Sequence, residues 1–253
     1  MPEGDAIAYA AKRIRPLLEG RVPDTVATPH ARHANDRWPE RLGGRAVTSI
    51  DTHGKHLFLR FDGGFVLHSH LGMTGSWRVY RVGGRTSGRA WIVLRAGASE
   101  VAELGGPTLE LLTEGRARLL EQRLGPDVLA EEFDRGGFLG RLRADDPTRP
   151  TGDALLDQGT VAGIGNIWKA EGCWEALVDP WRSVGELSDA EALAVIDAVR
   201  PRMLRSAKEG PRTIRPRVYS RSGRPCPRCG ATICARGQGD ANRTTYWCPG
   251  CQR

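Results

Sequence analysis

The sequence predicts an α+β protein of several domains. A mostly β N-terminal domain, interpreted as a β-sandwich, is followed by a helical region and a small cysteine-bearing module. Short segments of alternating apolar and polar residues recur between 47 and 104, and one amphipathic helix precedes them. Helical periodicity then dominates from about 126 to 210, which predicts the second region.

The opening helix is predicted by apolar residues at helical spacing, namely Ile7, Ala10, Ala11, Ile14, Leu17 and Leu18. Asp5 is a suitable N-cap for this helix. Most chain termini fray because nothing holds them, whereas Pro2 and Glu3 would lie at a fixed point just ahead of a docked helix. The alternative interpretation is a proline that only resists aminopeptidases, followed by a solvated glutamate.

The strands are marked by alternation and by turn residues. The segment 56–61 alternates, Asp62–Gly64 supplies a turn, and 65–69 resumes the alternation. The segments 91–95 and 100–104 predict a further pair of strands.

The helical region begins after the Gly125-Pro126 pair, which marks a break in the pattern. Further on, Ser188 and Glu191 form a capping box ahead of an apolar-periodic helix. Pro201 is expected to kink or end that helix, because proline has no backbone N–H to donate.

Composition limits the class of protein. Hydrophobic residues make up 40% of the 253 residues, enough for a sizeable core. No apolar run approaches the length of a membrane span, and the N-terminus has no apolar signal core. We therefore expect a cytoplasmic protein without a membrane partner, whose six cysteines are thiols or metal ligands rather than disulfides.

Positive charge is concentrated near the C-terminus. Residues 200–253 carry thirteen Arg or Lys against two acidic residues, in a chain of net charge +7. Such a distribution indicates a nucleic-acid partner, and the alternative is a solvated arginine-rich surface. A lysine required for chemistry must be one of only four, which are Lys12, Lys55, Lys169 and Lys208.

Two C-x-x-C pairs in the terminal module predict a metal site. Cys226 and Cys229 are separated from Cys248 and Cys251 by 18 residues, a spacing typical of four-cysteine zinc sites. Redox dithiol chemistry is the alternative, but it usually accompanies a βαβ pattern that the module lacks. Four thiolates leave no open coordination position, so we expect one structural zinc ion per chain.

A glycine-rich break stands in the stretch "LLDQGTVAGIGNIWKAEGCW" at 155–174. Its glycines allow backbone N–H groups to approach a phosphate closely, and the N-terminus of the helix that restarts at Asn166 favours an anion. A tight turn between packed helices is the alternative.

Together these stretches resemble the formamidopyrimidine-DNA glycosylase / endonuclease VIII family. The resemblance runs from end to end through "MPEGD", "GKHLFLRF", "SHLGMTGSWRV", "QRLGPDVL", "LLDQGTVAGIGNI" and "CPRCG…NRTTYWCPGCQR". The Pro-Glu-Gly opening resembles the endonuclease VIII branch more than the other. The resemblance implies a β-sandwich domain, a helix–two-turn–helix domain and a zinc-finger β-hairpin, with DNA in the cleft between the halves. The boundaries expected are 1–122, 123–215 and 216–253.

The resemblance also implies catalytic roles. After removal of the initiator methionine, Pro2 becomes a secondary amine that attacks the sugar of the damaged nucleotide. A free α-amine titrates near ~7.7–8.0 against ~10.4 for lysine, so more of it is neutral and nucleophilic at neutral pH. Glu3 matches the family's general acid/base, Lys55 the lysine of β-elimination and phosphate contact, and Arg243 the hairpin arginine associated with δ-elimination.

Four further residues match DNA-contact positions of the family. Asn166 matches an asparagine on the DNA backbone, and His70 and Arg123 fall at other contact positions. Met73 matches the apolar wedge that fills the gap left by an everted base.

The sequence is therefore interpreted as a bifunctional DNA glycosylase and abasic-site lyase of base excision repair. It would act as a monomer on damaged double-stranded or bubble DNA and nick the strand by β,δ-elimination. Oxidised pyrimidines are the expected substrates, because of the Pro-Glu-Gly opening and because 103–112 lacks the Arg-Phe pair of the purine-directed branch. The alternative is a non-catalytic lesion- or structure-specific DNA-binding protein on the same scaffold. A zinc-ribbon transcription factor would leave the N-terminal motif unexplained.

Overall fold

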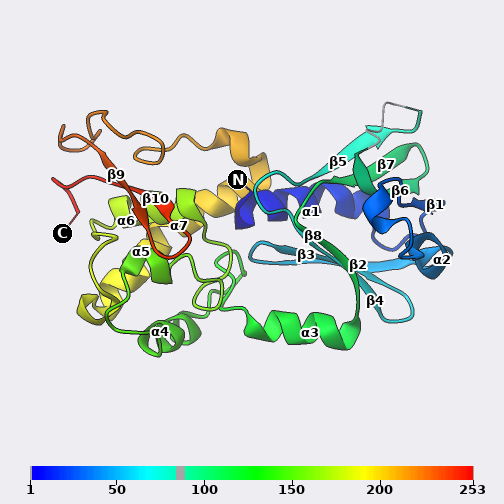
Figure 1. The fold of residues 1–253 in the computed structure, drawn as a ribbon, viewed down its shortest axis with the longest axis horizontal. Helices are drawn as coiled ribbons and strands as arrows, with labels where there is room; N and C mark the ends of the chain where they lie inside the picture. The colour runs from blue at the N-terminus through cyan, green and yellow to red at the C-terminus, as the bar shows by residue number, and fades with distance from the viewer. Residues whose placement is uncertain (1, 84–88, 253) are drawn as a thin grey trace. The chain divides into compact units, whose positions relative to one another are not determined.

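The computed structural model describes residues 2–83 and 89–252 and divides into two compact units. The first comprises Pro2 and Ala6–Gln122, and the second comprises Glu3–Asp5 and Arg123–Arg253. Figure 1 shows strands β1 to β8 in the first unit, and strands β9 and β10 with most of the helices in the second.

Two four-stranded antiparallel sheets form the first unit (Figure 1). One sheet has the order β2-β3-β4-β8 and the other the order β1-β6-β7-β5. The strands are β1 (Thr25–Ala27), β2 (Val47–His53), β3 (His56–Phe61), β4 (Phe65–His70), β5 (Ser76–Arg81), β6 (Ala90–Ala96), β7 (Ser99–Leu104) and β8 (Thr108–Thr113). The strand segments predicted between 47 and 104 are confirmed.

Helix α1 (Gly4–Leu18) buries the apolar face that its periodicity predicts. Ile7, Ile14 and Leu18 join residues of both sheets in one hydrophobic core. The expectation that Asp5 is the N-cap is wrong. Asp5 lies in the first turn of the helix, where its carboxylate accepts hydrogen bonds from Trp168 Nε1 and from the Ser206 hydroxyl instead.

Strand β8 and helix α3 (Glu114–Arg123) were not predicted from the sequence. Figure 1 shows α3 lying alongside the β2-β3-β4-β8 sheet, and its Ala117 packs with Phe58 and Val66 in a separate small cluster. The helix therefore covers the second face of this sheet. This explains why Phe58 is buried although it alternates with core residues. The short elements η1 (Ala31–His33) and α2 (Trp38–Leu42) complete the unit.

The helical part of the second unit encloses its own hydrophobic core. It contains α4 (Arg135–Arg143), α5 (Thr151–Ala154), α6 (Asn166–Glu175), η2 (Val184–Glu186), α7 (Asp189–Glu209) and η3 (Pro211–Thr213). The capping box of Ser188 and Glu191 is confirmed at the start of α7. Pro201 does not end this helix, because Val199 and Met203 on either side of it are both buried in the core.

Strands β9 (Cys234–Gln238) and β10 (Arg243–Trp247) form the C-terminal hairpin of the second unit. Trp174 of α6 packs with Val218, Ile233 and two cysteines in a cluster that joins the hairpin to the helix. Among residues 2–83 and 89–252, no helix has both the length and the apolar character needed to cross a membrane.

Candidate active site and metal centre

The N-terminus of α6 holds an anion that belongs to the protein itself. The Glu3 carboxylate accepts hydrogen bonds from the backbone N–H groups of Gly165 at 3.0 Å, Ile167 at 2.7 Å and Trp168 at 3.2 Å. Glu3 is only 1% exposed. The sequence predicts a phosphate at the glycine break and an anion at this helix end, whereas the group that occupies these donors in the structure is a buried carboxylate of the chain itself.

Two glycine positions allow this approach. A Cβ atom at Gly165 would lie 2.3 Å from Glu3 Cδ, and one at Gly4 would lie 2.8 Å from Gly163 Cα. The Gly4 N–H donates to the Gly163 carbonyl at 2.9 Å. The Pro-Glu-Gly opening and the Gly-Ile-Gly-Asn break therefore fit each other, which holds the residues that follow Pro2 in place.

Asn166 connects α6 to the hairpin. Its Nδ2 donates to the Thr244 carbonyl at 2.7 Å, and its side chain is mostly buried. Its Oδ1 is buried and makes no hydrogen bond within the part of the chain that the structure describes. Arg243, the residue before Thr244, is exposed at the start of β10. The side chain of Asn166 thus anchors the strand that carries Arg243.

Lys169 is a residue of this region to which no sequence motif assigns a role. Its Nζ donates to Thr245 Oγ1 at 2.5 Å and to Gln238 Oε1 at 3.3 Å, so it bridges α6 to both strands of the hairpin. Burial lowers the pKa of Lys169 to about 8. The signals that could have found it are its place three residues after Asn166 and the scarcity of lysine in the chain.

Glu171, on the same helix, was also missed. Its carboxylate is fully buried and accepts hydrogen bonds from the backbone N–H groups of Arg217 and Val218 at 2.9 Å and of Tyr219 at 3.1 Å. Arg202 adds an ion pair at 3.1 Å. Burial, followed by the charge of Glu3, raises the pKa of Tyr219. Glu171 therefore holds the loop that brings Tyr219 into the electrostatic environment of Glu3.

The first unit brings together a second set of the predicted residues. Lys55 lies in the turn between β2 and β3, and the next residue, His56, pairs in register with His70 at the end of β4. Burial, followed by the charge of Lys55, lowers the pKa of His70. Met73 follows in the loop between β4 and β5 and is 66% exposed, as an inserting side chain would need to be.

A histidine chain beside Lys55 was not predicted. His56 Nδ1 lies 2.8 Å from His68 Nε2, and His68 Nδ1 lies 2.9 Å from Glu110 Oε1 on β8. Burial, together with the neighbouring histidines, lowers the pKa of His56 to about 3, and burial also lowers the pKa of His68. Because these rings stay neutral at neutral pH, they can relay hydrogen bonds without adding positive charge near Lys55.

The remaining predicted residues are more exposed. Pro2 is partly exposed beside buried Glu3, and Arg123 is exposed at the end of α3. In the second unit, Glu3, Asn166 and Arg243 are thus linked through α6 and β10. In the first unit, Lys55 and His70 are linked through β3 and β4.

The four cysteines of the terminal module come together as their spacing predicts. The Sγ atoms of Cys226, Cys229, Cys248 and Cys251 all lie within 4.8 Å of one another. Trp174 Nε1 and the Arg228 N–H both donate to Cys226 Sγ, at 3.3 Å and 3.4 Å. Such donors stabilise a thiolate, so the cluster can bind a metal ion.

The other two cysteines lie outside this cluster. Burial raises the pKa of Cys173 to about 12, which keeps it a thiol, and Cys234 lies at the start of β9.

Family models match most of the chain. The formamidopyrimidine-DNA glycosylase N-terminal domain matches residues 1–105, and the formamidopyrimidine-DNA glycosylase H2TH domain matches residues 124–217. The chain belongs to the formamidopyrimidine-DNA glycosylase family. The resemblance stated from the sequence is therefore confirmed.

Curated relatives place the chain within this family. The probable endonuclease 8 2 of Streptomyces coelicolor is 40% identical over 100% of this chain and 94% of its own length. The DNA-(apurinic or apyrimidinic site) lyase Nei2 of Mycolicibacterium smegmatis is 35% identical, covering 100% and 99%. The formamidopyrimidine-DNA glycosylase of Thermus thermophilus is 32% identical, covering 100% and 98%. The chain is thus closer to the endonuclease VIII branch.

A solved structure supports the fold. The formamidopyrimidine-DNA glycosylase of Lactococcus lactis, bound non-covalently to DNA with an abasic site, matches with a TM-score of 0.85 over 100% of both chains at 24% identity. The predicted α+β fold is confirmed, with its β-sandwich, helix–two-turn–helix region and C-terminal hairpin.

Proposed function

We propose that this chain is a bifunctional DNA glycosylase and abasic-site lyase that uses Pro2 as its nucleophile. One observation carries the proposal. The residue after Pro2 is locked in place, because the Glu3 carboxylate is buried on three backbone N–H groups at the start of α6. Membership of the family and relatives named as endonucleases, lyases and glycosylases support the two activities.

The proposed reaction begins at the amine of processed Pro2. Its nitrogen forms a bond to C1′ of the damaged nucleotide while the glycosidic bond breaks and the base leaves with a proton. The sugar ring opens to give a Schiff base, which acidifies the neighbouring C2′–H and so permits elimination of the 3′ phosphate. Glu3 is proposed as the general acid/base that moves protons in these steps.

Lys55 and Arg243 have proposed roles in strand cleavage. Lys55 assists β-elimination and contacts phosphate, and the neighbouring His56 and His70 are held neutral by burial. Arg243 promotes δ-elimination from the exposed start of β10. We assign contacts with the DNA to His70, Arg123 and Asn166, and the gap-filling insertion to Met73. The side-chain amide nitrogen of Asn166 is engaged by Thr244, so any DNA contact from it uses the remaining polar atoms.

We propose one structural zinc ion for the cysteine cluster. Tetrahedral zinc with bonds of about 2.3 Å separates its sulfur ligands by roughly 3.8 Å. The Sγ atoms of Cys226 and Cys251 lie 3.9 Å apart, and those of Cys229 and Cys248 lie 3.4 Å apart, so the donor set fits.

Metal analysis should find one zinc per chain. Replacing Cys248 by Ser should lower DNA affinity, because it would unfold the hairpin that carries Arg243. Active protein without zinc would contradict this assignment.

Oxidised pyrimidines are the proposed lesions, in double-stranded or bubble DNA. The greater identity to a relative named endonuclease 8 than to one named formamidopyrimidine-DNA glycosylase supports this branch. Release rates for thymine glycol, dihydrouracil and 8-oxoguanine opposite cytosine test it, and faster release of 8-oxoguanine than of both pyrimidines would contradict it.

We also propose a monomer acting on DNA in the cytoplasm, with domains 1–122, 123–215 and 216–253.

Borohydride trapping tests the nucleophile. Borohydride should reduce the Schiff base and fix processed protein covalently to an oligonucleotide with an abasic site. A verified form that retains the initiator methionine should not be trapped, because Pro2 then has no free amine. Undiminished trapping of that form would overturn the Pro2 assignment. The next candidate would then be Lys55, tested by Lys55→Ala.

A further inference from the structure

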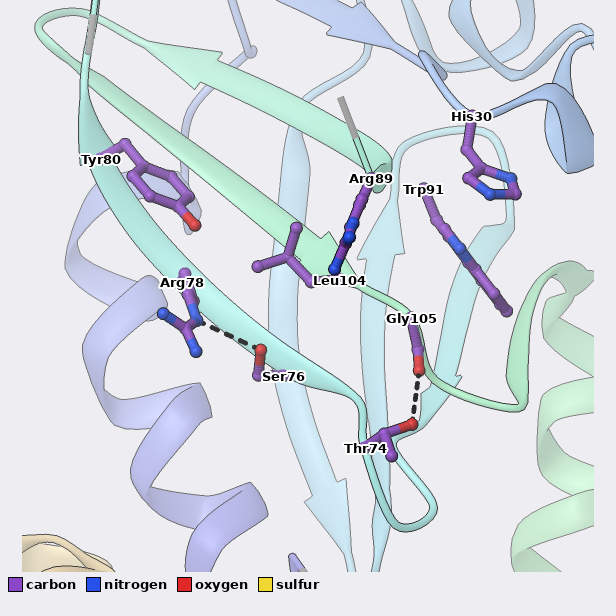
Figure 2. Close-up of a pocket in the computed structure, with 9 residues that line it drawn as sticks. All are labelled: His30, Thr74, Ser76, Arg78, Tyr80, Arg89, Trp91, Leu104 and Gly105. Carbon is purple, nitrogen blue, oxygen red and sulfur yellow. Dashed lines mark hydrogen bonds between the residues drawn. The ribbon is translucent and has the colours of Figure 1, made fainter. Parts of the chain in front are cut away.

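The first unit contains a pocket that none of the proposed roles uses. It has a volume of about 610 Å³ and lies on the face of the β1-β6-β7-β5 sheet that turns away from the core. Ser76, Arg78 and Tyr80 of β5 line it together with Leu104 at the end of β7, and the Arg78 Nε–H donates to Ser76 Oγ at 3.3 Å (Figure 2). Volumes of roughly 300–1,000 Å³ are typical of small-molecule sites.

A β-bulge directs a tryptophan into this pocket. The pairing of β6 with β7 shifts between Ala90 and Ile92, which leaves Trp91 as the extra residue. Bulges re-aim a side chain that regular alternation would place elsewhere. Figure 2 shows the Trp91 ring beside His30 at the pocket, and the Arg32 guanidinium lies 4.8 Å from the centre of that ring.

The lining combines aromatic rings with positive charge. Arg78 and Arg89 contribute guanidinium groups, while Tyr80 and Trp91 contribute ring surfaces. Among the described residues that line the pocket there is no carboxylate. This combination suits an anion that carries a flat ring, because cations neutralise phosphate while aromatic side chains stack on bases.

The pocket adjoins the loop that carries Met73. Thr74, the next residue, lines the pocket, and its hydroxyl donates to the Gly105 carbonyl at 3.2 Å (Figure 2). This bond ties the loop to the rim of the pocket. The residue proposed for insertion into the duplex is thus one position away from the lining of the pocket.

We propose that this pocket binds a single unpaired nucleotide of DNA, with its base stacked on Tyr80 or Trp91 and its phosphate held by Arg78. The assignment of DNA as the ligand rests on the proposed function. The aromatic rings and the guanidinium groups that would bind the nucleotide are lining residues of the pocket, whatever its ligand. Such a pocket would favour bubble or single-stranded DNA over a fully paired duplex, because only unpaired bases can enter it.

Fluorescence anisotropy with two single-stranded probes of equal length tests the proposal. One probe is an oligothymidylate, and the other carries the same phosphates on abasic sugars. Arg78→Ala should weaken binding of both probes. Trp91→Leu should weaken binding of the oligothymidylate about tenfold while leaving the abasic probe unchanged, since only a base can stack. Tyr80→Leu provides a second stacking variant in case the tryptophan variant does not fold.

Arg81→Ala is the matched control. Arg81 also lies on β5 and is exposed, but it does not line the pocket, so its loss removes one positive charge outside the site. Equal losses for Arg78→Ala and Arg81→Ala would overturn the proposal, because general charge would then explain the binding. Two stacking variants that bind oligothymidylate as tightly as the unmodified protein does would overturn it as well.

Cleavage of a fully paired duplex with an abasic site is measured in parallel. If the unmodified protein does not cleave it, the proposed function fails while the probe experiment still decides whether the pocket binds a nucleotide. If it cleaves normally and the pocket variants retain this cleavage but lose oligothymidylate binding, both proposals stand.

Discussion

Two buried glutamates, one in each unit, are accommodated in different ways. Glu3 in the second unit is 1% exposed and accepts three backbone N–H groups at the start of α6. Glu103 in the first unit is 0% exposed and accepts one N–H, from Gly106 at 2.9 Å. Its Oε2 makes no hydrogen bond among the described residues.

Glu3 and Glu103 are about equally buried, so the difference between the two carboxylates lies in the number of hydrogen-bond donors around each. Burial raises the pKa of Glu103 to about 7, and its one hydrogen bond offsets this only in part. Glu171 resembles Glu3, because three backbone N–H groups and Arg202 surround its carboxylate. In the second unit, both Glu3 at the N-terminus of α6 and Glu171 within α6 thus accept three backbone N–H groups. In the first unit, Glu103 accepts only one.

The largest expected effect follows from replacing Glu3. Glu3→Gln keeps the shape of the side chain but removes its basicity and turns an amide toward backbone donors. We expect cleavage of an abasic-site duplex to slow by about 10²–10⁴-fold under single-turnover conditions, the range for loss of a general acid/base. Glu103→Gln is the control and should cleave at the normal rate. Equal rates for the two variants would remove the distinction between the two glutamates.

A second effect concerns Glu171 and the stability of the protein. Glu171→Ala leaves three backbone N–H groups and the Arg202 guanidinium without their acceptor. The free energy of unfolding should fall by about 3–5 kcal/mol, as expected when one partner of a buried ion pair is removed. Denaturant titration measures it. Glu175→Ala on the same helix is the control, and it should change stability by less than about 0.5 kcal/mol because its pair with Arg228 is at the surface.

The smallest effect concerns Glu103 and depends on pH. Because the pKa of Glu103 is raised in the folded protein from 4.5 to about 7, its contribution to stability is fully present below pH 4.5 and is lost as the pH rises toward 7. Glu103→Gln resembles the protonated form at every pH. It should therefore stabilise the protein by about 3 kcal/mol at pH 8 and by less than about 1 kcal/mol at pH 5.

Denaturation at these two pH values measures the difference for Glu103→Gln. Glu100→Gln, on the same strand but only partly buried, is the matched control. A gain for Glu103→Gln that is the same at both pH values would contradict the assignment of a raised pKa.

Local patterns in the sequence were sufficient for several features. Strands β3, β4, β6 and β7 match segments predicted from the sequence, and the cysteine cluster follows from two C-x-x-C pairs, because each pattern reflects contacts between neighbours in the chain. The capping box of Ser188 and Glu191 spans only three residues and was predicted for the same reason. Helix α3 shows no such pattern, because few of its residues are apolar and Ala117 is its only fully buried residue.

The sequence by itself thus determined the family, the classes of element and the candidate residues, since periodicity, spacing and motif order are all readable along one chain. Only the tertiary structure decided the partners of those residues. The anion at α6 is a carboxylate 162 residues earlier in the chain, and Asp5 accepts from Trp168, 163 residues away, instead of capping its own helix. Pro201 lies inside α7 because a buried apolar face continues on both sides of it. Long-range packing and hydrogen bonding outweighed local preference at each of these places, and no local pattern records such contacts.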